Sequence, residues 1–364
     1  MADLPTFPYR TVPDTARWST SISGRSAIEI DPHHAPYLRI NPEDRVASAG
    51  SCFAQRISQS LQSSGYNYLI TEKGPPFLNS AKRHELGYGV YSARHGNIYT
   101  ALQLLQLFQR AFGGPVPHEP IWRLADGHYA DPFRPSVQIG GFQSEEECLR
   151  DRASHLAAVR QMFLDVDVFI FTLGLTEAWY SMVDGAVFPT CPGSVLGGTY
   201  DPARHAFINF SVDEVTAHLE EFREALGAVN PKAQILLTVS PVPLQATFEP
   251  RHVLQSTVYS KSVLRVVCEN MVRRHANVHY FGSYEIVVAT GDSKSYFLDD
   301  HRTVSDTAVA HVLQCFHRQF TGAGGNAAPA AAPDAAAVRT MPKPMCDEDL
   351  VMAALADQIA GRPQ

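Results

Sequence analysis

The stretch Val46–Gln59, VASAGSCFAQRISQ, predicts the turn around which the fold is organised. Its first residues are small and apolar, as they are in strands buried within a parallel sheet. Gly50 then permits a tight turn. Apolar residues follow at helical spacing: Phe53, Ile57 and Leu61. Ser51 and Cys52 therefore lie where a strand ends and a helix begins, the edge at which open α/β sheets bind ligands.

This position favours chemistry at Ser51. The first turn of a helix leaves N–H groups unpaired and carries the positive end of the helix dipole. A serine there is placed to attack a carbonyl carbon, and the N–H groups are placed to hold the resulting oxyanion. The alternative is that Ser51 only caps the helix, as serines at helix starts commonly do. Cys52 is a second possible nucleophile, because a helix N-terminus lowers the pKa of a thiol.

Residues Gly50–Ala54 spell GSCFA, and the chain resembles the family named for this signature. Further stretches resemble the family as well: Gly96–Thr100, Thr172–Gly174, Thr238–Pro243, Ser260–Ser262 and Ser283–Glu285. GSCFA proteins are related to the SGNH (GDSL-like) hydrolases, which are serine esterases and acyltransferases on a flavodoxin-like α/β fold. The resemblance implies a three-layer fold with a mostly parallel sheet, irregular insertions, and Ser51 as the nucleophile.

The hydrophobic pattern by itself predicts alternating strands and helices. Strands are expected at 46–50, 66–70, 166–171, 234–239 and 278–281. Helices are expected at 53–61, 99–112, 145–163, 211–229, 256–275 and 304–320. Residues 115–142 contain aromatic residues and alternate weakly, and they are expected to form an inserted hairpin or loop. Residues 184–210 are rich in Gly, Pro and aromatic residues and are expected to have little regular structure. This order favours a parallel sheet with helices on both faces.

The composition divides the 364 residues into four parts. Residues 1–44 carry several aromatic residues and are expected to pack on the domain as an arm, because linkers rarely contain so many. Residues 45–320 form the α/β domain. Residues 321–343, rich in Gly, Ala and Pro, are expected to be a flexible linker. Residues 344–364 are expected to include a short helix that docks on this domain or on a protein partner.

Charge and cysteine content narrow the possible functions. A net charge of −7 without basic clusters argues against a nucleic-acid partner. Six cysteines are scattered without a Cys-x-x-Cys pair, so no zinc site or redox motif is expected. The sequence shows no phosphate loop or metal cluster, and we expect no cofactor. With free thiols, no apolar signal segment and no membrane span, a cytoplasmic location is expected.

A nucleophilic serine needs a base, and the resemblance places it in a late loop. SGNH enzymes carry Asp-x-x-His there, whereas here Asp300 is followed three residues later by Thr303. His301 is the histidine of this loop, and Asp299 or Asp300 would orient it. The alternative is that His301 faces water or caps a helix. His252 is the rival base or a substrate contact, because its loop also follows a strand end.

The oxyanion hole requires fixed hydrogen-bond donors. The N–H of Ser51 or Cys52 is one candidate. The resemblance places further donors at Gly89 or Asn97, in the loop where SGNH enzymes carry a glycine and an asparagine. It also places Thr176 where those enzymes have an asparagine. Glu177 would orient Thr176 or bind a sugar hydroxyl. The alternative for this last pair is that both cap a following helix.

Two functions of different classes follow. The first is a serine esterase or O-acyltransferase acting on an acyl group, expected to be acetyl, of a carbohydrate or another acylated small molecule. Trp122, Trp179 and Tyr180 offer flat faces that would stack on sugar rings. The second is an inactive binding or scaffold protein, suggested by the missing Asp-x-x-His histidine and by Thr176, since a fold alone does not imply activity.

Overall fold

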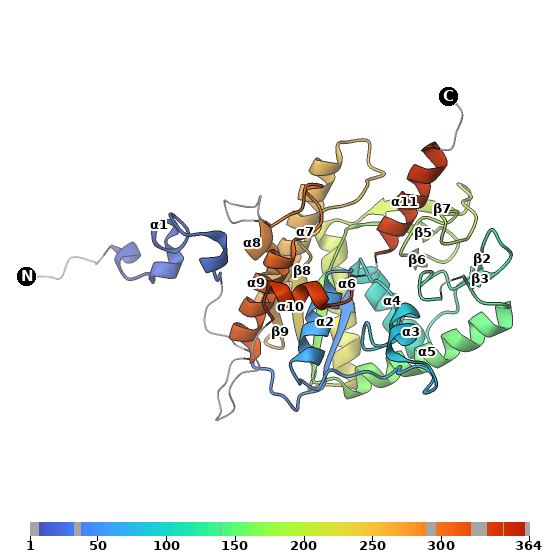
Figure 1. Ribbon diagram of the computed structural model, residues 1–364, viewed down its shortest axis with the longest axis horizontal. Helices are drawn as coiled ribbons and strands as arrows, with labels where there is room; N and C mark the ends of the chain where they lie inside the picture. The colour runs from blue at the N-terminus through green and yellow to red at the C-terminus, as the bar shows by residue number, and fades with distance from the viewer. Residues whose placement is uncertain are drawn as a thin grey trace, which may run out of the picture.

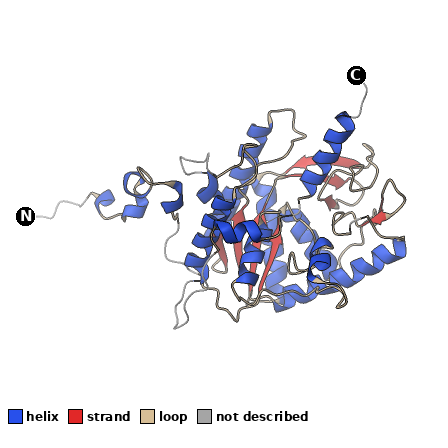
Figure 2. Ribbon diagram, in the orientation of Figure 1, coloured by secondary structure: helices blue, strands red, loops and turns tan. Residues whose placement is uncertain are grey.

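A computed structural model describes residues 7–32, 38–138, 140–288, 296–321, 333–344 and 346–360. A parallel sheet lies at the centre with helices on both of its faces (Figures 1 and 2). The predicted α/β class is therefore confirmed.

The central sheet has the strand order of a flavodoxin-like fold. Its strands are β1 (Val46–Gly50), β4 (Val168–Leu173), β8 (Gln234–Val239) and β9 (Val278–Phe281), in the order β1-β4-β8-β9 and all parallel. The second predicted strand is reduced to one parallel bridge between Tyr68 and Val46, on the free edge of β1. Counting that bridge as a strand gives the order 2-1-3-4-5, whose ligand site lies between the first and third strands.

Alternate side chains of the strands enter two separate cores, as the period of two requires. Ala47, Phe169 and Leu237 are among those that face the first core. Its helices are α4 (Ala101–Ala111), α5 (Glu145–Asp165), α6 (Val212–Val229) and α7 (Val253–Arg274). Val46, Ile170 and Leu236 face the second core. Its helices are α2 (Ala54–Ser63), α8 (Ser283–Val288), α9 (Asp306–Phe316) and α10 (Ala335–Thr340). A π-helical turn, His317–Thr321, extends α9.

Both inserted stretches contain small antiparallel sheets, and the first is a hairpin of the kind expected for 115–142. One joins β2 (Trp122–Arg123) to β3 (Tyr129–Ala130). The other has the order β6-β5-β7, with β5 (Glu177–Ser181), β6 (Val187–Phe188) and β7 (His205–Asn209). The expectation for 184–210 is therefore wrong at β6 and β7. Both strands pair with β5, and such non-local pairing leaves little trace in the local sequence pattern.

The N-terminal arm differs from its prediction. Its segments η1 (Pro8–Arg10), η2 (Asp14–Ala16) and α1 (Trp18–Ser21) contain no buried residue. The aromatic side chains that suggested packing are exposed: Phe7 by 61%, Tyr9 by 70% and Trp18 by 69%. These elements are too short to offer an apolar face, and Figure 1 shows them extending away from the sheet. Burial begins with Ala27 in η3 (Ala27–Glu29).

The C-terminal part also differs from its prediction. Within the expected linker, α10 forms and buries Val338 against the second core; residues 322–332 lie outside the described range. The last helix, α11 (Asp347–Ala360), lies beside the β5–β7 sheet (Figure 1). A short α3 (Ser80–Glu85) completes the helices of the described residues. None of these helices combines the length and apolar character needed to cross a membrane.

Candidate active site

Ser51 lies at the tip of the turn between β1 and α2. Gly50 has φ +145°, and a Cβ on it would lie 2.5 Å from the Thr172 carbonyl oxygen, so only glycine fits. Ser51 itself is 4% exposed. Its Oγ is buried and has no hydrogen-bond partner among the described residues. A buried hydroxyl without a partner costs free energy and requires a functional explanation.

A narrow pocket opens at Ser51, and we call it the serine pocket. Its walls are Ser51, Cys52, Tyr99, Gly174, Leu175, Ser240, Val242, Pro243, Lys261 and Glu348. These residues come from the carboxyl ends of β1, β4 and β8, from α7 and from α11. Gly174 is placed so that a Cβ on it would lie 3.1 Å from the Ser51 Cβ. The free volume, about 10 Å³, is room for about one water molecule.

Lys261 is the buried cation of this pocket. It lies on α7, is 1% exposed, and donates from Nζ to the Gly174 carbonyl at 2.7 Å. Burial lowers the pKa of Lys261 to about 7, against an opposing effect of the Glu348 carboxylate. A large fraction of Lys261 is therefore neutral at neutral pH, and a neutral amine accepts a proton. The sequence analysis did not select this lysine as a base.

Glu348 brings the C-terminal helix into the pocket. Its Oε2 accepts from Arg302 at 3.1 Å, and Asp349 accepts from the same guanidinium at 2.8 Å. Burial raises the pKa of Glu348 to about 7, although the charges of Arg302 and Lys261 oppose this shift. Two titrating groups thus lie in one small pocket, which is typical of functional sites.

Cys52 is not placed to be a thiolate. Its thiol lies against that of Cys346, the residue before α11, and this contact together with burial raises the pKa of Cys52 well above its usual value. A thiol with a raised pKa is a weak nucleophile. Ser51 remains the better candidate.

Two of the predicted oxyanion donors, the Ser51 N–H and the Asn97 side-chain amide, already have hydrogen-bond partners. The Ser51 N–H donates to the Thr172 carbonyl at 3.3 Å. Asn97 lies near the turn, because the Tyr91 hydroxyl lies 2.9 Å from both the Ser51 carbonyl oxygen and the Asn97 Oδ1. The amide nitrogen of Asn97 donates to Asp347 of α11 at 3.1 Å. Gly89 is not among the residues of the serine pocket; its carbonyl accepts from the Gln62 side chain.

The pair Thr176 and Glu177 begins a strand and not a helix. Thr176 is fully buried, and its hydroxyl donates to Asn209 at 2.7 Å. Glu177 accepts from the Thr247 hydroxyl at 2.7 Å. Because β5 follows, the alternative that both residues cap a helix is wrong.

The two predicted histidines do not line the serine pocket. His301 is exposed at φ +53°, in a loop where Asp300 accepts from the N–H groups of Arg302 and Thr303. His252 is exposed and caps α7, with Nδ1 accepting from the Leu254 N–H at 3.1 Å. The residue of this loop that contacts the serine pocket is Arg302, which binds the carboxylate of Glu348. The roles of both histidines in catalysis stay predictions.

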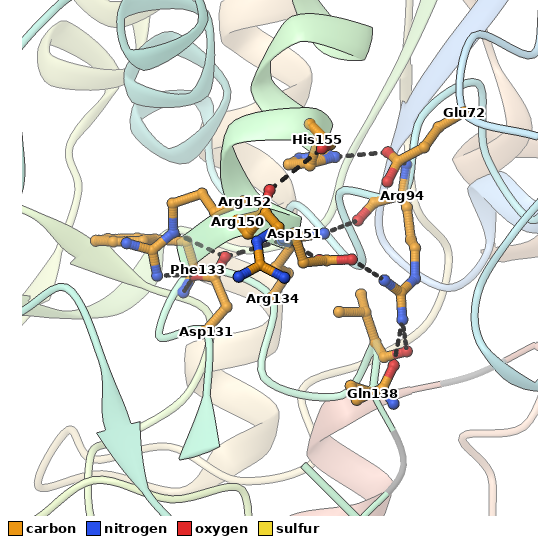
Figure 3. Close-up of polar contacts among 12 residues, drawn as sticks. Glu72, Arg94, Asp131, Phe133, Arg134, Gln138, Arg150, Asp151, Arg152 and His155 are labelled. Atoms are coloured by element: carbon orange, nitrogen blue, oxygen red, sulfur yellow. Dashed lines mark hydrogen bonds and ion pairs between the residues drawn. The ribbon is translucent and has the colours of Figure 1, made fainter. Parts of the chain in front are cut away.

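A second charged cluster holds the segment that carries Asn97 and Tyr99, and we call it the arginine cluster. It consists of Arg94, Asp131, Arg134, Asp151 and Arg152, with Glu72 and His155 at its edge (Figure 3). Asp131 is 2% exposed and contacts Arg134 at 2.9 Å and Arg152 at 2.7 Å. Both guanidiniums hold the pKa of Asp131 far below its usual range despite burial. Composition alone does not reveal this cluster.

Comparison with known proteins agrees with the signature. The model of the GSCFA family matches residues 45–316, most of the chain. Among solved structures, the chain is similar to a carbohydrate esterase family 3 protein from Talaromyces cellulolyticus, with 10% identity and a TM-score of 0.34. That similarity covers 74% of this chain and 92% of the other, and at this TM-score it has no bearing on function. No curated protein matches the chain. The family match over most of the sequence, with Ser51 in the signature itself, shows that the chain belongs to the GSCFA family.

Proposed function

We propose that the protein is a serine esterase or O-acyltransferase that forms an acyl-enzyme on Ser51. The observation that carries this proposal is the Ser51 Oγ, which is buried without a partner among the described residues and shares its pocket with Lys261. A serine is a weak nucleophile unless a base lies beside it. Lys261 supplies that base, because its amine is partly neutral near pH 7.

The reaction uses these two groups in sequence. Ser51 Oγ attacks the acyl carbon, and its proton passes to the neutral Nζ of Lys261. The tetrahedral intermediate collapses, the ester C–O bond breaks, and the leaving alkoxide takes the proton from Lys261. Water or an acceptor hydroxyl then attacks the acyl carbon of the acyl-enzyme and gives its proton to Lys261. The bond between the acyl carbon and Ser51 Oγ breaks, and Oγ takes the proton back from Lys261. Hydrolysis and transfer differ only in this last nucleophile.

The sequence analysis expected an acetyl group on a carbohydrate, and the proposal keeps the carbohydrate as leaving group or acceptor. Of the residues expected to stack on sugar rings, Trp179 lines a cavity beside the serine pocket. Trp122 is 1% exposed and packs with Ala130 and Phe188, so it is not placed to stack on a sugar. Tyr180 packs against the first core.

The experiment measures p-nitrophenyl acetate hydrolysis and covalent labelling by a fluorophosphonate. The variants are Ser51→Ala, Lys261→Met, His301→Ala and His252→Ala, with Lys82→Met as the matched control at an exposed lysine. We expect Ser51→Ala to lose labelling and about 10³-fold or more in kcat/KM. Lys261→Met should lose at least about 10²-fold, the usual contribution of a general base. The other variants should keep near-native rates.

Other outcomes of this experiment would favour a histidine base or a protein without catalytic activity. Loss with His301→Ala or His252→Ala and retention with Lys261→Met would give the role of base to the histidine and refute the lysine. Absence of both turnover and labelling in the native protein would favour the binding or scaffold protein. The position of both histidines outside the serine pocket is the observation that keeps this second candidate open.

A further inference from the structure

A large cavity lies directly beside the serine pocket. It has a volume of about 540 Å³, within the usual size of ligand sites. One wall is the β5–β7 sheet with Trp179 and Phe207, and a second is the loop that follows β8, with Phe248. The third wall is α11, which contributes Val351, Met352 and Leu355.

The cavity and the serine pocket adjoin each other. Leu175 and Glu348 line both, so a molecule in the cavity ends next to Ser51. Glu348 separates the two spaces, and its carboxyl is held by Arg302.

The walls suit an apolar chain better than a sugar. Aromatic rings meet edge to face, with the ring centroid of Trp179 lying 4.9 Å from that of Phe248 and 5.8 Å from that of Phe207, so one ring face is occupied in each contact. A sugar also needs hydrogen-bond partners, yet the Glu177 carboxylate already accepts from Thr247. The Thr190 hydroxyl is buried without a hydrogen-bond partner among the described residues, and Tyr200 and Gln245 bring further polar groups to walls that are otherwise mostly apolar. Mostly apolar walls with a small number of polar groups are typical of small-molecule sites.

Apolar surface remains open at this site. Phe248 is 65% exposed, and Leu355 is 42% exposed. Soluble proteins rarely leave neighbouring large apolar side chains in water unless they bind something there. An alkyl chain would cover both.

We propose that this cavity binds the acyl chain of the substrate, and that the substrate is an ester or thioester of a medium- or long-chain acyl group. The proposal rests on the proposed function of Ser51 and specifies its substrate class. The acyl chain of the substrate lies between the β5–β7 sheet and α11, and its carbonyl group reaches Ser51 past Glu348. The carbohydrate expected from the sequence then acts as acceptor or leaving group outside the cavity.

The first test compares p-nitrophenyl esters of acetate, butanoate, hexanoate and octanoate with an acetylated xylo-oligosaccharide. Each methylene that enters the cavity should raise kcat/KM by roughly three- to fourfold. From butanoate to octanoate the expected rise is on the order of 10²-fold. A flat or falling series, with activity on the acetylated oligosaccharide, would overturn the acyl-chain site.

The second test fills the cavity. Val351→Trp adds bulk to its α11 wall, and Ala353→Trp is the matched control on an exposed residue of the same helix that does not line it. We expect Val351→Trp to lower the octanoate-to-acetate ratio of kcat/KM at least tenfold. Ala353→Trp should leave this ratio unchanged. Equal ratios in both variants would contradict the proposal.

A binding measurement separates this inference from the proposed function. Dodecanoate is titrated calorimetrically into Ser51→Ala and into Ser51→Ala carrying Val351→Trp. Binding to the first and its loss in the second would support the cavity even if no ester is turned over, in which case only the proposed function of Ser51 fails. No binding to either protein would overturn the inference, whatever the activity of Ser51.

Discussion

The arginine cluster and the serine pocket are both buried and charged, yet they satisfy their charges differently. In the arginine cluster, every carboxylate contacts at least one guanidinium or imidazole, at 2.6–2.9 Å. In the serine pocket, Lys261 donates to a neutral carbonyl, and the Ser51 hydroxyl has no partner among the described residues. The pKa of Asp131 is therefore far from neutrality, whereas those of Lys261 and Glu348 lie at about 7.

The difference teaches that burial alone does not identify a reactive site. Completely paired charges stabilise a fixed geometry and do not titrate near neutral pH. Incompletely paired charges remain able to exchange protons near neutral pH, which catalysis requires. We expect substitutions in the arginine cluster to change stability, and substitutions in the serine pocket to change activity.

The largest effect on stability is expected for Asp131→Asn. Removing this carboxylate leaves Arg134 and Arg152 buried with one partner fewer, and breaking a buried ion pair costs about 3–5 kcal/mol. Urea unfolding measures the loss. Asp126→Asn is the control, because Asp126 pairs with His128 at the surface. Equal unfolding midpoints for the two variants would remove the distinction between the two clusters.

A smaller effect is expected in the pH profile of Glu348→Gln. In the native protein, kcat/KM should rise as the pH increases through about 7, because Lys261 must lose its proton to act as a base. Glu348 raises the pKa of Lys261, while Arg302 lowers it. Without the Glu348 charge, the midpoint should move down by on the order of one unit.

Glu269→Gln is the control for this profile, since Glu269 pairs with two arginines elsewhere on α7. Its midpoint should equal that of the native protein. A Glu348→Gln midpoint that stays in place or moves up would show that Lys261 is not the titrating base.

The smallest effect is expected at the edge of the arginine cluster. Burial favours the neutral form of Glu72, but the hydrogen bond with His155 and the charge of Arg134 outweigh it and hold the pKa at about 2. Because the folded pKa is depressed, the stability from Glu72 is present above its unfolded pKa of about 4.5 and is lost as the pH falls toward 2. Glu72→Gln should flatten the loss of stability over this range.

Thermal unfolding between pH 5 and pH 3 measures this slope. Glu224→Gln, at an exposed glutamate of α6, is the control and should follow the native curve. If Glu72→Gln also follows it, this ion pair does not contribute to acid stability, and the cluster is held by its arginine–aspartate contacts alone.

Local pattern predicted the central elements well. The strands at 234–239 and 278–281 have the predicted bounds, because their apolar runs are short and bounded by polar or turn residues. The helix predicted at 145–163 is two residues longer and ends at Asp165, and Ser144 caps its N-terminus. The predicted turn at Gly50 and Ser51 is present, with a backbone that only glycine tolerates. The N-terminal arm, β6 and β7 were predicted less well, because their structure depends on partners distant in the sequence.

The sequence by itself determined the parallel sheet, the strand–helix turn and the serine at its tip, because these follow from local periodicity and from one glycine. Only the tertiary structure decided which groups surround that serine. Lys261 and Glu348 lie far from Ser51 in the chain and meet it through the packing of α7 and α11. Their pKa values near 7 arise from burial, and burial depends on the whole fold and not on the order of neighbouring residues.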